Sequence, residues 1–247
     1  MTAAWWVRVP RDFVRVSGPD ARSFLQGQLS QDVDALAIGD SAPSFLLQPQ
    51  GKVDAYLRVT RTDDDAFVLD VDRGWGDAVV TRLTRFKLRT KADVERIDGW
   101  SCIGAVSGDG HVTELVGADV RADGDEGDPL LYEVLRIKAG VPRMGSEIDE
   151  TTIPNAVGVV DRAVSFTKGC YTGQELVARI DSRGGNTPTK LVGVRGRASA
   201  GDAVTVDGRD VGRVTSAAGD VALAYVRRDV ELPSTSNLGV LESLPLT

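Results

Sequence analysis

The C-terminal part of the chain consists of short apolar runs separated by turns that contain glycine and aspartate. The runs cover residues 191–194, 203–206, 211–214 and 221–226. Strands this short and this closely spaced are typical of a small all-β barrel or sandwich. Asp207-Gly208 predicts a hairpin turn within it. We therefore expect an all-β lobe at residues 191–247, with 233–247 poorly tied down.

The preceding residues mix both kinds of element. Alternating apolar residues predict strands over residues 7–16, 44–48, 53–60, 66–71, 92–97, 101–106 and 131–137. A period of three to four residues predicts helices over residues 21–29 and 76–86. A chain of 247 residues is also too long for one small core. The predicted fold class is therefore α+β with several lobes.

Histidine and cysteine are scarce, which excludes several kinds of site. The chain has one histidine, His111, and two cysteines, Cys102 and Cys170. A structural zinc site needs about four such ligands. A Ser-His-Asp triad would need His111, whose place in a Gly-Asp-Gly-His turn favours an exposed residue. The cysteines allow one disulfide at most, and reduced thiols are expected.

Charge and hydropathy limit the partners. The formal net charge of −7 argues against general nucleic-acid binding, which needs a positive face for phosphates. The first residues lack the features of a signal peptide, and no apolar run reaches the roughly 20 residues of a membrane span. We expect a cytoplasmic protein that contacts neither nucleic acid nor membrane.

One segment, residues 163–186, combines a thiol with a helix start. We predict a strand at 163–167, a tight loop around Cys170, and a helix with Thr172 as N-cap and Glu175 in a capping box. The helix N-terminus and the Lys168 cation would both lower the pKa of the Cys170 thiol. The alternative is that Cys170 is a small buried hydrophobe and Glu175 only a cap.

The same segment carries a resemblance to a known family. The octapeptide Lys168-Gly169-Cys170-Tyr171-Thr172-Gly173-Gln174-Glu175 resembles the signature of the YgfZ family, folate-binding relatives of the glycine-cleavage T-protein, an aminomethyltransferase. Further similar stretches lie at residues 16–20, 24–33, 46–52, 135–140, 149–154 and 212–216.

The resemblance implies a three-lobed, aminomethyltransferase-like ring that holds tetrahydrofolate or another reduced folate. The implied lobes are a discontinuous central domain of residues 1–45 and 134–190, a ferredoxin-like domain of residues 46–133, and a β-barrel of residues 191–247. It further implies a monomer that supports iron–sulfur cluster assembly or repair and tRNA modification through the Cys170 thiol, with iron–sulfur assembly or client proteins as partners.

The resemblance also implies a set of folate-contacting residues, with departures from the T-protein pattern. Tyr132 would stack on the folate rings, and a core tyrosine is the alternative. Lys138 stands where many T-proteins have a glutamate expected to pair with the pterin. Either Glu175 or another acid replaces that glutamate, or pterin binding is weak. The implied folate contacts further include Tyr171 and Gln174.

Basic residues suggest how the anionic glutamate tail of folate would be held. Lys138 could attract this tail, and a basic funnel for it could be formed by Arg179, Arg183 and Lys190, with solvated surface charges as the alternative.

A missing acid bears on the reaction. The T-protein has an acidic pair at positions that correspond to Ala55-Tyr56 here, and Asp54 is one residue out of register. A one-residue shift in a strand turns a side chain to the opposite face. Three functions stay open: a folate-dependent accessory protein for iron–sulfur assembly, an aminomethyltransferase, and a non-catalytic binding module.

Overall fold

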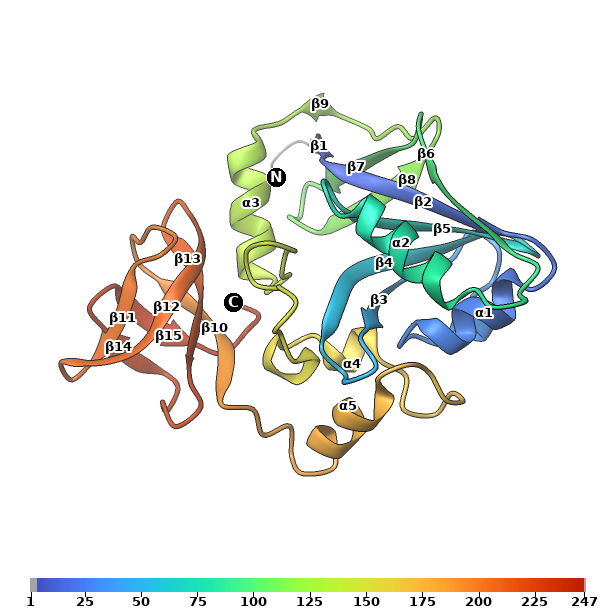
Figure 1. The fold of residues 1–247 in the computed structure, drawn as a ribbon. Helices are drawn as coiled ribbons and strands as arrows, with labels where there is room; N and C mark the ends of the chain where they lie inside the picture. The colour runs from blue at the N-terminus through green and yellow to red at the C-terminus, as the bar shows by residue number, and fades with distance from the viewer. Residues whose placement is uncertain (1–3, 247) are drawn as a thin grey trace.

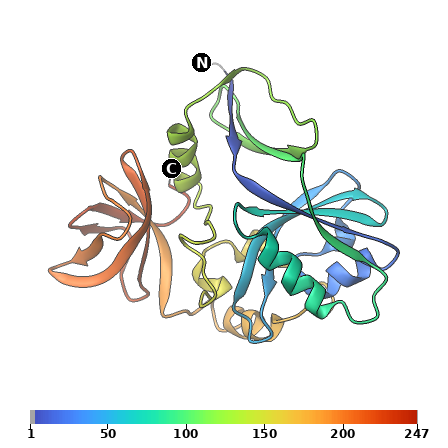
Figure 2. The same cartoon turned by 45° about the horizontal axis from the view of Figure 1, so that its top comes forward.

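The computed structural model describes residues 4–246 and contains three β-sheets (Figures 1 and 2). The first sheet is antiparallel, with the strand order β3-β4-β5-β2-β6. Its strands are β2 (Arg11–Ser17), β3 (Ser41–Leu47), β4 (Val53–Asp63), β5 (Ala66–Asp72) and β6 (Asp93–Ile97). Helix α1 (Ala21–Gln28) follows β2, and helix α2 (Gly76–Phe86) packs on this sheet. The predicted helix over residues 76–86 is confirmed.

The second sheet has the order β8-β7-β1-β9. Its strands are β1 (Trp5–Val9), β7 (Ser101–Val106), β8 (Val112–Gly117) and β9 (Asp125–Glu126). The single strand predicted over residues 7–16 is wrong, because β1 ends before Pro10 and β2 joins the other sheet. Proline has no backbone N–H to donate, so the ladder is interrupted there.

Residues 131–137, predicted as a strand, belong to helix α3 (Pro129–Lys138). The Asp128 side chain accepts a hydrogen bond from the Leu130 N–H, and Pro129 occupies the first turn, as is common at helix starts. Tyr132 and Arg136, four residues apart, are both buried. Figure 1 shows α3 between the C-terminal lobe and the two sheets.

Short helices follow α3 in a largely irregular segment. They are a 3-10 helix (Pro154–Ala156), α4 (Val160–Ala163) and α5 (Gln174–Asp181). The strand predicted over residues 163–167 is wrong, since α4 ends at Ala163 and a loop continues to α5. The Ser165 N–H donates to the Ser30 carbonyl, which fixes the start of that loop beside the end of α1.

The C-terminal lobe is a nearly closed barrel with the order β11-β12-β13-β10-β15-β14. Its strands are β10 (Thr189–Arg195), β11 (Ala203–Val206), β12 (Arg209–Ala218), β13 (Val221–Arg227), β14 (Ser234–Ser236) and β15 (Gly239–Glu242). Asn237 bonds Thr205 and Ala203, which brings the β14 end to β11.

The expectation that residues 233–247 are poorly tied down is wrong for the residues that the structure describes. Strand β15 pairs with β10, Leu246 is buried, and the Leu246 N–H donates to the Lys138 carbonyl. The α+β fold class with a C-terminal β-barrel is confirmed. The division into three domains stays a prediction, and its boundary after residue 45 falls inside β3. Within residues 4–246, no helix has both the length and the apolarity to cross a membrane.

Candidate functional site

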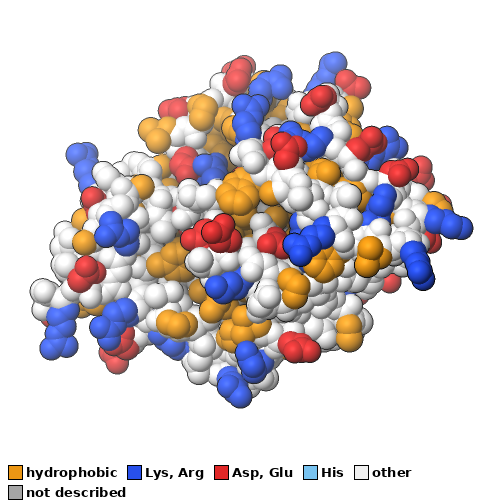
Figure 3. Space-filling model, viewed as in Figure 1, with side chains coloured by type: hydrophobic (Ala, Val, Ile, Leu, Met, Phe, Trp, Pro, Cys, Tyr) orange, Lys and Arg blue, Asp and Glu red, His pale blue; other side chains and the backbone are white. Residues whose placement is uncertain are grey.

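A cavity of about 450 Å³ lies between α3, β4 and β8, with α4 at its edge. Its volume falls in the range of small-molecule sites, about 300–1,000 Å³. The lining residues are Arg11, Pro43, Tyr56, Leu57, Arg58, Val112, Glu114, Tyr132, Leu135, Arg136, Ala139, Val141 and Arg162. Figure 3 shows apolar side chains near the middle of this face, between the barrel and the sheets, with charged side chains beside them.

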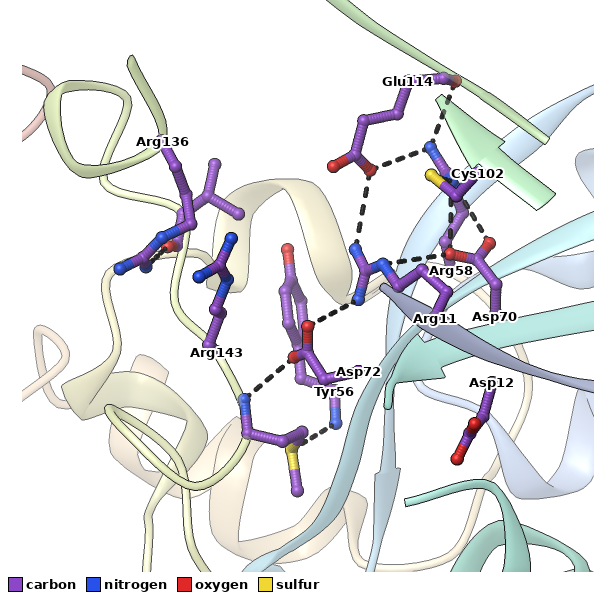
Figure 4. A network of polar contacts seen from close by, with 12 residues as sticks. Arg11, Asp12, Tyr56, Arg58, Asp70, Asp72, Cys102, Glu114, Arg136 and Arg143 are labelled. Atoms are coloured by element: carbon purple, nitrogen blue, oxygen red, sulfur yellow. Dashed lines mark hydrogen bonds and ion pairs between the residues drawn. The ribbon is translucent and has the colours of Figure 1, made fainter. Parts of the chain in front are cut away.

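Two arginines and one carboxylate of the cavity wall belong to a cluster that also includes two aspartates behind the lining (Figure 4). Arg58 binds Asp70 with two nitrogens, at 2.9 and 3.1 Å, and Glu114 at 3.1 Å. Arg11 contacts Asp72 at 3.1 Å and Glu114 at 3.5 Å. The cluster joins both sheets, because Arg11, Arg58 and the two aspartates lie on the first and Glu114 on the second.

Glu114 is the carboxylate of this cluster that lines the cavity. Burial alone would raise its pKa, but Arg11 and Arg58 outweigh burial, so the pKa is lowered and the side chain is ionised at neutral pH. By contrast, burial raises the pKa of Asp72 above its ordinary value. An ionised carboxylate in a largely apolar cavity can accept hydrogen bonds from a ligand but is a weak base.

Tyr132 is the one predicted folate residue among those that line the cavity. Its hydroxyl donates to Glu114 Oε1 at 2.6 Å, and the side chain is buried. Burial and the Glu114 charge raise the pKa of this phenol. The ring is held in place against Gly104, where a Cβ atom would lie 2.2 Å from the Tyr132 ring. A larger residue at position 104 would therefore displace the ring from the cavity.

Two further arginines reach the cavity from the other side. Arg136 on α3 is almost fully buried and bonds Glu133, Glu147 and the Val141 carbonyl. Arg162 on α4 is exposed and donates to the Gly140 carbonyl at 3.3 Å. The cavity thus has one carboxylate, Glu114, with its two arginine partners on the sheets, and two further arginines on the helices, with apolar surface between them.

Lys168 is held by the end of α1. Its ammonium group donates to the carbonyl oxygens of Gln26, Leu29 and Gln31 at 2.7, 2.8 and 2.8 Å. Burial lowers the pKa of Lys168 to about 8, against the opposing effect of nearby aspartates. The lysine therefore anchors the octapeptide loop to the C-terminus of α1, where backbone carbonyls lack helical partners.

Cys170 is exposed and lies outside the cavity lining. The predicted capping box is wrong: Gly173, with φ of 81°, occupies the N-cap position without a side-chain cap. Gln174 instead accepts a hydrogen bond from the Tyr171 N–H through its side chain. Tyr171 is buried, and burial raises its pKa to about 12.

The octapeptide also packs against the turn at residues 49–52. A Cβ atom on Gly173 would lie 2.4 Å from the Gln48 carbonyl oxygen, and one on Gly51 would lie 2.5 Å from Leu176 Cβ. Real Cβ atoms do not approach this closely. Both positions therefore require glycine, which explains why the two motifs carry it.

The other predicted site residues lie outside the cavity lining. Glu175, Arg179 and Arg183 are exposed on α5 or just after it, and Lys138 is half-buried at the end of α3. Lys190 donates to the Val230 carbonyl on the barrel. The basic residues predicted to attract the glutamate tail are thus spread over α3, α5 and β10, and their role stays a prediction.

Most of the cavity wall was not predicted from the sequence. The wall residues Arg11, Arg58 and Glu114, and Asp70 behind them, come from different strands, and no linear motif joins them. A signal was nevertheless present, because Arg58 and Asp70 each interrupt an apolar run, Leu57-Arg58-Val59 and Leu69-Asp70-Val71. Buried charges of this kind need partners. Asp54 pairs with Arg82 at 2.8 Å instead, outside the cavity lining.

Comparison with known proteins gives consistent similarities. Residues 189–240 match a family described as the CAF17 C-terminal beta-barrel domain. An uncharacterised protein of Haemophilus influenzae is 31% identical over 188 residues, which cover 70% of this chain and 67% of that protein. The tRNA-modifying protein YgfZ of Edwardsiella ictaluri is 27% identical, with 70% of this chain and 65% of that one covered.

Two further similarities are to a mitochondrial protein and to a solved structure. The mitochondrial iron–sulfur cluster assembly factor IBA57 homolog of Neurospora crassa is 27% identical, with 70% of this chain and 49% of that protein covered. The chain thus spans about half of that fungal relative and about two thirds of the bacterial ones. The crystal structure of glycine cleavage system aminomethyltransferase T from Bartonella henselae superposes with a TM-score of 0.76 at 19% identity, covering 100% of this chain and 87% of that one.

Proposed function

We propose that this chain, which belongs to the YgfZ family and has a fold like that of the glycine-cleavage aminomethyltransferase, binds a reduced folate in the cavity beside Glu114. We further propose that it supports iron–sulfur cluster assembly. The names of its relatives, a tRNA-modifying protein and an iron–sulfur cluster assembly factor, support this cellular role. The observation that carries the folate part is an ionised carboxylate facing a largely apolar cavity.

The chemistry of the cavity wall fits a reduced folate. A pterin edge presents N–H and amino donors, which a carboxylate such as Glu114 can accept. Glu114 Oε1 accepts one hydrogen bond, from Tyr132, within the described part of the chain, so it keeps acceptor capacity. Leu135 and Val112 offer apolar surface to the aromatic rings, and Arg162 can receive the glutamate carboxylates.

A binding role suits the cavity better than aminomethyl transfer. Proton transfer needs a base whose pKa lies near the operating pH. The pKa of Glu114 is lowered by two arginines, and the Asp54 carboxylate is paired with Arg82 outside the cavity lining. We infer that folate acts here as a bound cofactor, and that the exposed Cys170 serves protein partners rather than the cavity.

Calorimetric titration of the full chain with tetrahydrofolate tests the folate part. We expect Glu114→Gln to weaken binding about tenfold or more, the scale of one lost charge-assisted hydrogen bond. The matched control is Glu175→Gln on α5, which should bind like the wild type. Circular dichroism verifies that both variants are folded, and Tyr132→Phe serves as a milder second variant. Equal loss in the Glu175 variant, or none at Glu114, contradicts the assignment of the cavity.

Complementation tests the cellular role. In a strain that lacks its own family member, Cys170→Ala should fail to restore the activity of iron–sulfur enzymes, whereas Cys170→Ala protein should still bind tetrahydrofolate. Full rescue by Cys170→Ala would remove the thiol from the proposal, and a lack of rescue by the wild-type chain would remove the iron–sulfur role.

A further inference from the structure

Glu147 is a buried carboxylate at the junction between the barrel and the rest of the chain. Its side chain has no exposed surface. Oε1 accepts a hydrogen bond from the Ser216 hydroxyl on β12 at 2.5 Å. Oε2 accepts from the Arg143 N–H at 3.0 Å and lies 3.3 Å from Nη1 of Arg136. The backbone carbonyl of Glu147 accepts from the Tyr225 hydroxyl on β13 at 2.9 Å.

Arg136 connects this carboxylate to the cavity. Its guanidinium lies in the cavity wall, and the side chain is only 5% exposed. Glu133 holds Nε and Nη2 of Arg136, while the Val141 carbonyl and Glu147 hold Nη1. Figure 4 shows Arg136 and Arg143 across the cavity from Arg11 and Arg58, with the Tyr56 ring between them. A change at Glu147 therefore acts directly on a residue of the cavity wall.

We infer that Glu147 is a positioning residue that couples the docking of the barrel to the geometry of the folate cavity. The inference rests on the proposed function for the identity of the ligand. The Ser216–Glu147–Arg136 chain of contacts carries it: one end belongs to the barrel and the other to the cavity wall. None of these three residues belongs to the octapeptide.

The coupling follows from the burial of the carboxylate. A buried charge must keep its hydrogen-bond partners, because water cannot replace them. When the barrel withdraws, Oε1 loses the Ser216 hydroxyl, and the carboxylate has to turn toward Arg136 or Arg143. Either movement shifts the Arg136 guanidinium in the cavity wall. By linkage, a ligand that fixes Arg136 also stabilises the docked barrel.

The test removes the barrel side of the contact without touching the cavity. Ser216→Ala deletes the hydroxyl that binds Glu147, and Ser216→Thr retains one. The matched control is Thr215→Val, on the same strand, because the Thr215 hydroxyl donates to the Leu223 carbonyl instead. Calorimetry of the full chain with tetrahydrofolate should give about fivefold weaker binding for Ser216→Ala, a typical coupling magnitude. Ser216→Thr should recover most of the affinity, and Thr215→Val should stay near the wild type.

A second readout needs no ligand. Amide hydrogen exchange over residues 136–141 should be at least about threefold faster in Ser216→Ala than in the wild type or Thr215→Val, because α3 loses a fixed partner. If Ser216→Ala leaves both affinity and exchange unchanged in a folded protein, the coupling is refuted. If the wild type does not bind tetrahydrofolate, the proposed ligand is wrong, and unchanged exchange in Ser216→Ala then refutes the coupling separately.

Discussion

Gly51 and Gly173 lie against each other, 122 positions apart in sequence, so that a Cβ atom at 173 would stand 3.2 Å from the Gly51 Cα. Both residues have positive φ, 83° and 81°. The contact holds the turn after β3 against the start of α5. Packing therefore requires glycine at this position of the octapeptide, independently of any chemistry that Cys170 performs.

Replacing Gly173 by alanine should destabilise the protein by about 2–4 kcal/mol, because the strain of positive φ, about 1–2 kcal/mol, adds to a steric overlap. Gly184→Ala is the control: φ is 78° there, and a Cβ would meet no atom within 4 Å. It should cost only about 1–2 kcal/mol. Urea unfolding of both variants measures the difference. Equal losses would mean that the loop yields to the added methyl group.

Lys168→Met should destabilise the fold by about 2–3 kcal/mol, since three carbonyl oxygens at the end of α1 would lose their shared donor. Lys190→Met is the control, because Lys190 bonds one carbonyl, that of Val230, and should cost about 1 kcal/mol or less. Chemical denaturation checks both values. If Lys168→Met changed the reactivity of Cys170 but not the stability, the lysine would act on the thiol rather than as an anchor.

Glu114 predicts a pH dependence. Its pKa in the folded state is lowered from the ordinary 4.5, so its stabilising contribution is present above that value and is lost as the pH falls through the folded pKa. Glu114→Gln should therefore cost about 3 kcal/mol at pH 7, and the difference from wild type should shrink as the pH falls below about 4.5.

Unfolding at several pH values measures this difference. The control is Glu126→Gln, an exposed residue on β9 that changes the net charge equally. A difference between wild type and Glu114→Gln that stays constant from neutral pH to pH 3 would show that the Arg11 and Arg58 pairs do not stabilise the ionised form.

The two thiols should react at very different rates. Cys170 is exposed, whereas Cys102 is 2% exposed and burial raises its pKa to about 12. At pH 8 a disulfide reagent should label one thiol per folded chain, with the second at least roughly a hundredfold slower, since the thiolate is the reacting species. Cys170→Ser should abolish the fast phase and Cys102→Ser should leave it. Two fast phases in the wild type would contradict the burial of Cys102.

The sequence predicted the barrel and α2 well, because their apolar periods are regular and their turns carry glycine. It failed at residues 131–137, where apolar residues at most positions fit either a strand or a buried helix. Asp128 and Pro129 favour the helix, because the Asp128 side chain caps its first turn and proline has the φ that a helix start requires. The end of the chain was also misjudged, because the pairing of β15 with β10 depends on residues more than forty positions away.

The candidate site was only partly accessible from sequence. Tyr132 was identified and does line the cavity. Arg11, Arg58 and Glu114 were not, since they meet only when β2, β4 and β8 assemble. The octapeptide was wrongly interpreted as a capping box, because the positive φ of Gly173 and the contact with Gly51 cannot be predicted from local spacing.

The pairing of β1 with β7 has a consequence for how this protein is made. Residues Trp5 to Val9 find their antiparallel partners at residues 102–106, so the first strand has no ladder until about a hundred residues have left the ribosome. Contacts this distant in sequence slow folding and leave apolar edges exposed meanwhile. The N-terminal strand should therefore depend more on chaperones during synthesis than the β11–β12 and β12–β13 hairpins of the barrel, whose strands are neighbours in sequence.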